Sequence, residues 1–441
     1  MESRLAHRRR TAKLGRMLTF VSAIGFISLA TQQLYAVPQF ARRYNLKCSA
    51  CHTIAPNLNE QGYLFKRLGY HLPPALMKGQ PAPTISYLVR SEPKWDLANN
   101  LSVAVSDFSF QTDRSTTVGS TPTSTSAFQI NTWNSYAAGW VPDTNFFYFS
   151  EFDIVTNGTT SPDLMNAYFG YSGGNARSSW YVAGGREHLQ VGEGTRAAQI
   201  YSLLMASPLV FENAEPTNFM IDQSPVGIDA GYTWSSDSYK HVFAATGKVT
   251  NGDNADGSEI LGTSTKNSKD TWLDLDYWYA PESGITYLNY YGSKDQIQNS
   301  GLTNQFTYRP TIRRQGFFAN YMLPNSKADF LGGYLHAKDD WQATSGVAEG
   351  YFTSNGLFGE ADYYLTPGLV AAARYDLIHQ TIPGGPGREV MHDWTAAMNK
   401  TLTASGNIVG RLSYSYTAGS DPSTAVKGTS SQFQADIMFN F

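Results

Sequence analysis

The chain has 441 residues, of which only 16% are charged and 14% are aromatic, and its formal net charge is -3. Soluble domains contain about 25% charged residues, so this chain is poor in charge for its length. The slightly acidic balance argues against a nucleic-acid partner. The sequence also contains no Ser-His-Asp, zinc-protease or phosphate-loop pattern, which excludes those familiar catalytic motifs.

Residues 1–36 have the features of a secretory signal peptide. Basic residues dominate positions 1–16, an uncharged apolar run follows over Met17–Ala30, and Leu34-Tyr35-Ala36 offers a small-residue cleavage site. The apolar run is shorter than the about 20 residues that a transmembrane helix needs, although a retained anchor stays open as an alternative. Cleavage after Ala36 would begin the mature chain at Val37.

The two cysteines of the chain stand in the run Cys48-Ser-Ala-Cys51-His52. This spacing is typical of c-type haem attachment, in which two thiols bond the haem vinyl groups and the adjoining imidazole ligates the iron. A disulfide would leave His52 unexplained, a zinc site would need a second cysteine pair, and a thioredoxin motif would need a βαβ context. We therefore expect one covalently attached haem c, with His52 as its proximal ligand.

From residue 84 onwards the sequence predicts a transmembrane β-barrel. No other apolar run approaches the length of a membrane-spanning helix. In Trp272–Trp278, the apolar Leu273 and Leu275 alternate with Asp274 and Asp276, as in a strand with one apolar and one polar face. The same alternation recurs in two further segments, Ala371–Gln380 and Arg411–Tyr416.

A soluble β-sandwich would also alternate, but the end of the chain favours a barrel. Phe433, Ala435, Ile437, Phe439 and the terminal Phe441 occupy every second position. This pattern is similar to the closing strand of outer-membrane barrels. We therefore predict an all-β fold, a transmembrane antiparallel β-barrel of about 16 strands surrounded by outer-membrane lipid.

Sixteen strand-like segments can be counted, an even number as bacterial single-chain barrels require. Tight connections such as Pro281–Gly284 alternate with long polar ones such as Asn251–Lys269, which fits the periplasmic and extracellular ends of a barrel. The predicted segments are 100–112, 127–138, 143–155, 163–172, 178–186, 226–236, 239–249, 270–280, 284–293, 312–323, 327–338, 352–365, 368–380, 390–402, 406–417 and 430–441.

The segment Glu187–Pro225 interrupts this rhythm, since it lacks clean alternation and has some helical character over Thr195–Ser207. A loop of this length in a compact domain is usually functional. We expect it to fold into the lumen as a loop or short helix, or to cap the barrel on the extracellular side. Two further strands are the alternative.

The haem segment, residues 37–83, is too small to bury both its own core and a porphyrin. A helix is expected within it at Asn57–Leu68. A barrel of about 16 strands has a lumen wide enough to accept a plug. The predicted organisation is therefore a signal peptide over 1–36, an α-helical monohaem segment over 37–83 inside or beneath the barrel, and a porin-like barrel over 84–441.

A recognisable pattern of residues runs through the haem segment. Its members are Pro38-Gln39-Phe40-Ala41-Arg42, the run from Cys48 to His52, Pro56, Leu58, Gly62, Phe65-Lys66 and Gly69-Tyr70. This pattern resembles the amino-terminal cytochrome segment of outer-membrane cytochrome–porin fusions, the monohaem family that includes the iron oxidases of iron-oxidising bacteria. The match covers about residues 37–72, and beyond it only length, strand count and the terminal Phe agree.

The resemblance implies a porin-cytochrome that moves single electrons between the cell exterior and the periplasm. In the iron-oxidase members, extracellular Fe(II) donates the electron and a soluble periplasmic cytochrome collects it. The chain would then be an iron(II):cytochrome c oxidoreductase of the outer membrane. One haem accepts one electron, which matches the oxidation of Fe(II) to Fe(III).

Several residues are candidates for the remaining roles at the site. The distal haem ligand is His71 or Met77, or else a barrel residue such as His188 or His241. Acids on the polar strand faces are candidates for a substrate site, but ordinary lumen polarity is the favoured explanation for them, so no metal-entry site is assigned. These acids are Glu151, Asp153, Asp274, Asp276, Glu360 and Asp362.

Three functions stay open from the sequence. The first is an electron conduit that oxidises extracellular Fe(II). The second is the same architecture serving another donor or acceptor, or outward electron flow. The third is a diffusion porin whose haem plug is structural or sensory.

Overall fold

The computed structural model describes the barrel and part of the segment before it. The predicted signal peptide lies outside the described residues, as do Cys48, His71, Met77 and His188. The described residues are 40, 46, 50–54, 57–67 and 70, and 101–440 apart from 118–120, 131, 142–143, 157–158, 176, 188–202, 205–223, 239, 252–268, 280–282, 294–296, 299–306, 309–310, 325–326, 342–349, 382–387, 405–407 and 421–426.

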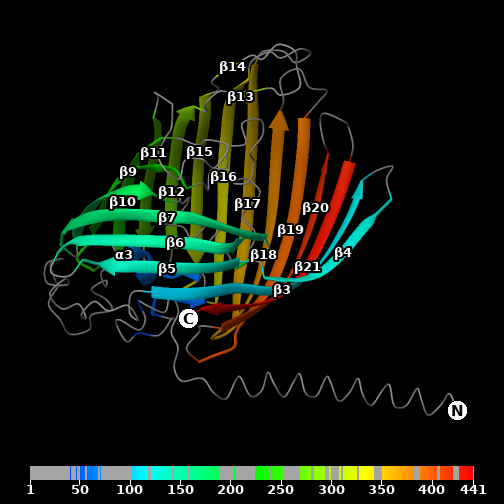
Figure 1. Ribbon diagram of the computed structural model, residues 1–441, viewed down its shortest axis with the longest axis horizontal. Coiled ribbons are helices and arrows are strands. Elements are labelled where there is room, and N and C mark those ends of the chain that lie inside the picture. Colours follow the sequence, from blue (N-terminus) through cyan, green and yellow to red (C-terminus); the bar gives the residue numbers. More distant parts are fainter. Residues whose placement is uncertain are drawn as a thin grey trace.

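Seventeen antiparallel strands close into one barrel (Figure 1). The closing pair joins the first barrel strand to the last, with Thr112 opposite Phe433. The strands are β3 (Leu101–Thr117), β4 (Thr123–Ile130), β5 (Thr132–Trp140), β6 (Phe146–Thr156), β7 (Thr159–Gly174), β8 (Ser178–Arg186), β9 (Val226–Ser235), β10 (His241–Thr250), β11 (Asp270–Tyr279), β12 (Ser283–Ser293), β15 (Thr311–Met322), β16 (Ala328–Trp341), β17 (Gly350–Thr366), β18 (Leu369–Thr381), β19 (Arg388–Thr401), β20 (Ile408–Ser420) and β21 (Lys427–Asn440).

Strands β4 and β5 are two pieces of one strand, separated by the single residue 131. Both pair with β3, and the register is unchanged across the break, because Phe108 lies opposite Ile130 and Ala104 lies opposite Asn134. The wall therefore has 16 strand positions, and the even number predicted from the sequence is confirmed. A further two-stranded sheet, β13 (Ile297–Gln298) with β14 (Thr307–Tyr308), was not predicted.

All sixteen predicted segments coincide with strands, and the main differences lie at one end of the barrel. β3 runs to Thr117, β16 to Trp341 and β20 to Ser420, each beyond its predicted end. These extensions all point toward the long connections. The predicted strands end where the alternation of apolar side chains ends. The backbone pairing continues further, because strands beyond the lipid boundary need no apolar side chains on their outer face.

Alternation separates an apolar outer surface from a mostly polar lumen. In β11, Asp274 is 2% exposed and faces inward, whereas Leu275 is 42% exposed and faces outward. The predicted faces of β18 and β20 are confirmed in the same way, with Arg374 and Arg411 buried inside. A closed barrel with an apolar outer surface is the architecture of a transmembrane barrel. Among the described residues, no helix is long and apolar enough to cross a membrane.

Of Glu187–Pro225, the structure describes residues 187, 203, 204, 224 and 225, and none of these five lies in a strand, so the alternative of two further strands stays a prediction for the rest of the segment. Leu203 and Leu204 are fully buried and pack on the inner wall of β18–β21, against Val370 and Ala372 among others. The Asn399 side-chain amide donates a hydrogen bond of 3.0 Å to the carbonyl oxygen of Leu203. The prediction that this segment folds into the lumen is therefore confirmed at these two leucines.

A charge on the outer face should cost stability according to its depth in the bilayer. Leu275 lies near the middle of β11, so Leu275→Arg should lower the free energy of unfolding by about 2–4 kcal/mol. Tyr279→Arg, on the same face at the end of the strand, should cost about 1 kcal/mol or less. Urea unfolding of the barrel in phospholipid bilayers measures both values, and equal costs would contradict the assigned outer face or its depth.

Candidate functional site

The described half of the haem motif forms a small hairpin that leads into a helix. Cys51 lies in a turn and His52 begins β1 (His52–Ile54), which pairs antiparallel with β2 (Asn57–Leu58) so that His52 lies opposite Leu58. The helix α3 (Glu60–Arg67) follows directly. It starts later than the predicted Asn57 because residues 57 and 58 are taken up by the hairpin.

Asn59 caps this helix and ties it to the haem motif. Its side-chain oxygen accepts hydrogen bonds from the backbone N–H groups of Gln61 (2.9 Å) and Gly62 (3.1 Å), which satisfies donors that lack a partner within the helix. Its side-chain amide donates to the Ala50 carbonyl oxygen at 3.3 Å, and its backbone N–H donates to that of Cys51 at 2.9 Å. One residue therefore fixes the start of α3 against the haem-attachment turn.

Gly62 allows the helix to approach the motif closely. A Cβ atom at this position would lie 2.3 Å from the Cys51 carbonyl oxygen and 2.8 Å from a methyl group of Leu58. Both distances are too short for a non-bonded contact. The glycine is therefore required by the packing of α3 on the turn that carries the Cys51 thiol.

Aromatic side chains dock the segment on the inner wall of the barrel. Phe40, Phe65 and Tyr70 pack with Phe147 of β6 and Tyr168 of β7 in one buried cluster. Four of the rings form a near-parallel stack from the segment into the wall, with centroid distances of 5.2, 5.7 and 5.4 Å and interplanar angles of 11°, 14° and 18°. The stacked rings are, in order, Phe40, Tyr70, Phe149 and Tyr168.

Tyr70 is the central contact of this cluster. Its hydroxyl forms a buried hydrogen bond with the hydroxyl of Tyr168, and its backbone N–H donates to the Phe65 carbonyl oxygen at 2.8 Å. Burial raises the pKa of the Tyr70 phenol well above its ordinary value, because the phenolate would lose its hydration. The residue adopts a φ of 68°, a left-handed conformation that costs a non-glycine residue about 1–3 kcal/mol. The ring contacts offset that cost.

The hairpin lies in the half of the lumen near the tight turns. Leu58 packs against Val242, Ala244 and Trp278. Val242 is the second residue of β10 and Trp278 the last but one of β11, and a short turn precedes β10 and follows β11. Because His52 lies opposite Leu58, the haem-motif hairpin is at the same height. Short turns mark the periplasmic end of transmembrane barrels.

A buried charge network lies beside the aromatic cluster. Lys248 of β10 pairs with Glu187 at 2.9 Å, and Lys66 of α3 and Asp229 of β9 line the same cavity of about 30 Å³, room for roughly one water molecule. Burial tends to raise the pKa of Glu187, but the positive charges of Lys248 and Lys66 outweigh it, and the pKa falls below its ordinary value. Glu187 is therefore held ionised between the segment and the wall.

The described residues fit the attachment of a haem. The thiol of Cys51 and the imidazole of His52 belong to half-buried residues at adjacent positions, and thiolate sulfur and imidazole nitrogen are the donors that a c-type haem uses. Cys48 and the two expected distal ligands, His71 and Met77, lie outside the described residues.

One proposed distal ligand is wrong. His241 is exposed on the outer surface, where its ring forms a 2.9 Å hydrogen bond with the Tyr277 hydroxyl. Its position just before the inward-facing Val242 puts it on the lipid side of β10. The other described barrel histidines, His336, His379 and His392, occupy outward-facing positions as well. No described barrel histidine can therefore ligate a haem in the lumen.

The six acids predicted to face the lumen do so. Glu151 accepts hydrogen bonds from the amides of Asn134 (3.2 Å) and Asn166 (2.6 Å), and Glu360 lies 3.5 Å from the guanidinium of Arg374. Within the described part of the chain, no three acidic, cysteine or histidine side chains are grouped as a metal site. Glu151 and Glu360 therefore belong to polar networks of the lumen, and no metal-entry site is assigned to the six acids.

Negative charge nevertheless dominates the inner wall. Among the described residues, twelve carboxylates are buried in the barrel strands, against four cationic side chains. The cations, Lys248, Arg314, Arg374 and Arg411, all pair with acids, as in the contact of Arg314 with Asp339. The buried side chains of the described inner wall thus include more acids than cations.

Comparison with known proteins supports the architecture. The structure is similar to an anion-selective porin from Comamonas acidovorans, with a TM-score of 0.53 and 11% identity over 77% of this chain and 98% of that chain. The chain has the fold of an outer-membrane porin. OprB of Pseudomonas putida (TM-score 0.49, 10% identity, 78% of this chain and 95% of that chain) and OmpF of Salmonella typhi (0.48, 14%, 78% and 98%) are also similar. No protein-family model and no curated protein matches the sequence.

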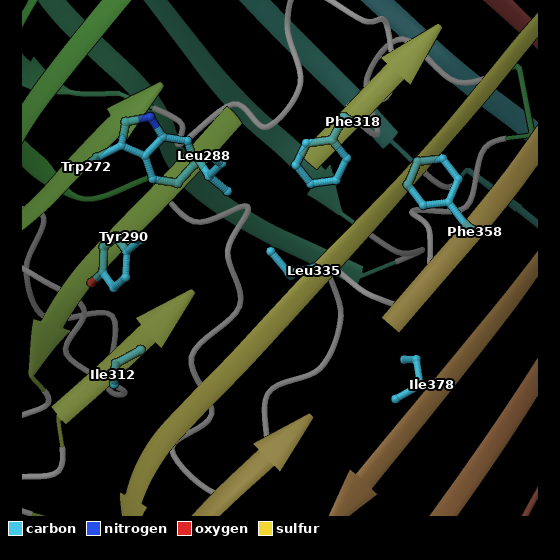
Figure 2. Close-up of a cluster of buried hydrophobic side chains, with 8 residues drawn as sticks. All are labelled: Trp272, Leu288, Tyr290, Ile312, Phe318, Leu335, Phe358 and Ile378. Carbon is cyan, nitrogen blue, oxygen red and sulfur yellow. The ribbon is translucent and has the colours of Figure 1, made fainter. Parts of the chain in front are cut away.

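The barrel has an apolar patch on its inner wall, which sequence reasoning missed. Eight buried side chains from β11 to β18 form it, and Figure 2 shows them on their strands. The sequence signal was a local failure of alternation, as at Phe317-Phe318, where both faces of β15 carry large rings. The interiors of transmembrane barrels are usually polar. An apolar, buried inner wall therefore indicates packing inside the lumen rather than open water.

Removing the Tyr70 ring should release the segment from the porin barrel wall. Tyr70→Ala should weaken docking by about 3–5 kcal/mol, because a buried aromatic ring is lost. Tyr70→Phe should cost about 1–3 kcal/mol, because the Tyr168 hydroxyl would be left buried without its partner. The rate of limited proteolysis within residues 37–70 of the folded barrel reports both changes.

Phe169→Ala is the matched control for these variants, because Phe169 neighbours Tyr168 but is 49% exposed on the outer face. This variant should leave the cleavage rate unchanged. Equal cleavage in the wild type and Tyr70→Ala would show that the ring does not hold the segment.

Proposed function

We propose that this chain is a haem-bearing porin barrel of the outer membrane that moves single electrons between the cell exterior and the periplasm. Extracellular Fe(II) is the proposed donor, and a soluble periplasmic cytochrome the proposed acceptor. One arrangement carries this proposal: the segment with the c-type haem motif is docked inside the barrel by the stack that includes Tyr70 and Tyr168. A redox centre held there would lie inside the barrel, which crosses the membrane that separates the two compartments.

The protein residues have distinct roles in this proposal. Cys48 and Cys51 would bond the haem c and His52 would ligate its iron, and His71 or Met77 would be the second ligand. When bound, the haem supplies a one-electron redox centre. Asn59 and Gly62 hold the Cys51 turn against α3, and Tyr70 and Phe65 fix α3 to the wall.

The charge of the lumen supports a cationic donor. Twelve buried carboxylates against four buried cations give the described inner wall a negative potential. Such a field raises the local concentration of cations and excludes anions. An aqueous Fe(II) ion would be attracted to the mouth of the barrel, whereas an anionic reductant would be repelled from it.

The filling of the lumen supports an electron conduit over an open pore. The haem segment packs on the wall formed by β6–β11, and Leu203 with Leu204 packs on β18–β21. In the order of strands around the barrel, these two walls lie on opposite sides. Because chain packs on two opposite walls, the lumen has little room for diffusing solutes.

The second candidate is a diffusion porin with a structural or sensory haem plug. The similarity to a porin from Comamonas acidovorans favours it at the level of fold. That porin is described as anion-selective, which the acidic inner wall of this chain does not favour. A conduit for another donor or acceptor, or for outward flow, uses the same architecture.

Rapid mixing of the purified, oxidised holoprotein with Fe(II) tests the proposed donor. The reduced α-band of the haem should appear, and the rate should fall as salt screens the lumen. A hexacyanoferrate(II) anion should reduce the haem more slowly than its driving force predicts. His52→Ala should lose stable ligation and change the spectrum. A haem that Fe(II) never reduces would rule out the iron-oxidase function.

Planar-bilayer recording separates the conduit from the porin. The wild-type barrel should give little or no steady current, because the lumen is filled from two sides. Tyr70→Ala should produce larger openings with a preference for cations, since the acidic wall is retained. Large, anion-selective currents from the wild type would favour the diffusion porin instead.

A further inference from the structure

The outer surface of the barrel carries a hollow that neither the fold nor the proposed function explains. Its floor, which we call the alanine hollow, consists of Gly359, Ala361, Ala373 and Ala396. Its walls are large rings from four strands, and its volume is about 510 Å³. The wall residues are Phe330, Tyr375, Trp394 and Tyr414.

The hollow follows from the register of five neighbouring strands. Phe330 lies opposite Ala361, Ala361 opposite Ala373, and Ala373 opposite Ala396, which in turn lies opposite Tyr414. Three small side chains in a row are therefore closed at each end by a ring. With strands about 4.8 Å apart, the rings stand about 19 Å from each other.

The floor is open space rather than tightly packed surface. A Cβ atom added at Gly359 would meet no atom within 4 Å. Above this floor, Tyr375 and Trp394 pack with a centroid distance of 4.3 Å, and Trp394 is 58% exposed. The nearest outward-facing side chains on the same strands are apolar as well, such as Met398 and Leu412. An apolar ligand chain lying in the hollow would bury its surface against the floor and against the surrounding rings.

A cation lies on the same outer surface, between the hollow and the tight turns. Lys400 faces outward on β19, on the same face as Ala396 and Met398, and is exposed. Four residues of strand place it about 13 Å from Ala396. It lies opposite Leu369, directly after the tight turn that joins β17 to β18. That position is the headgroup level of the periplasmic leaflet.

We propose that the alanine hollow binds one phospholipid of the periplasmic leaflet, with an acyl chain across Ala361, Ala373 and Ala396 and its phosphate at Lys400. The apolar hollow and the cation match the two ends of such a lipid, and their separation is within the length of one acyl chain. A lysine near the membrane surface attracts anionic headgroups. The site is independent of the haem and of the direction of electron flow.

A second copy of the chain fits the hollow less well. In an isologous dimer the same surface patch meets itself, so the hollow would face a hollow and enclose a void. The two Lys400 side chains would also approach each other across that contact. A phospholipid has no such conflict.

Native mass spectrometry of the full-length protein, extracted in mild detergent, tests the site. The wild type should retain one phospholipid and rebind dioleoylphosphatidylglycerol after delipidation. Ala373→Trp fills the floor and should reduce retention at least tenfold, and Ala396→Leu gives a milder loss if the larger change impairs folding. Ala319→Trp, on the outer face of β15, is the control and should retain the lipid.

The phosphate contact is tested separately with Lys400→Gln. This variant should weaken the binding of phosphatidylglycerol about fivefold but leave the binding of neutral diacylglycerol unchanged. Lys240→Gln, exposed at the same end of the barrel beside β10, should have no effect. Equal lipid retention by the wild type and both floor variants would overturn the site. A floor variant that changes the number of copies in the assembly, with its lipid retained, would instead assign the hollow to a contact between copies.

Discussion

Every backbone polar group of a strand that crosses a bilayer must find its partner within the protein, and this requirement fixes most of the structure. It closes β21 onto β3, in a barrel with 16 strand positions. That number in turn sets a lumen too wide for wall side chains alone to fill. The buried inner-wall residues therefore need further chain inside, which the haem-motif segment and Leu203-Leu204 supply.

The same requirement explains why the strands could be predicted from the sequence. Lipid on one side and polar networks on the other impose a period of two, as in Asp274 and Leu275. Where the outer face leaves the lipid, as at Thr117, the period disappears but the pairing continues, so strand ends could not be located. The break at residue 131 was equally invisible, because β4 and β5 keep one register on β3.

The candidate site was only partly predictable. The residues expected to attach a haem belong to a local motif, and Asn59 with Gly62 explains how α3 lies against that motif. The docking wall could not be found, because β6 carries aromatic residues on both faces, as at Phe146-Phe147. The contact of Tyr70 with Tyr168 joins residues 98 positions apart, and no local pattern encodes it. His241 was a candidate ligand because it belongs to the barrel. Inward-facing and outward-facing residues alternate along β10, however, and His241 occupies an outward-facing position.

The seam between β3 and β21 has a consequence for the order of assembly. β3 begins at Leu101 and β21 ends at Asn440, both at the end of the barrel that carries the tight turns. The described residues that precede β3 pack on the inner wall near this same end. The seam can therefore close before these residues dock, and their docking can be the last step of assembly.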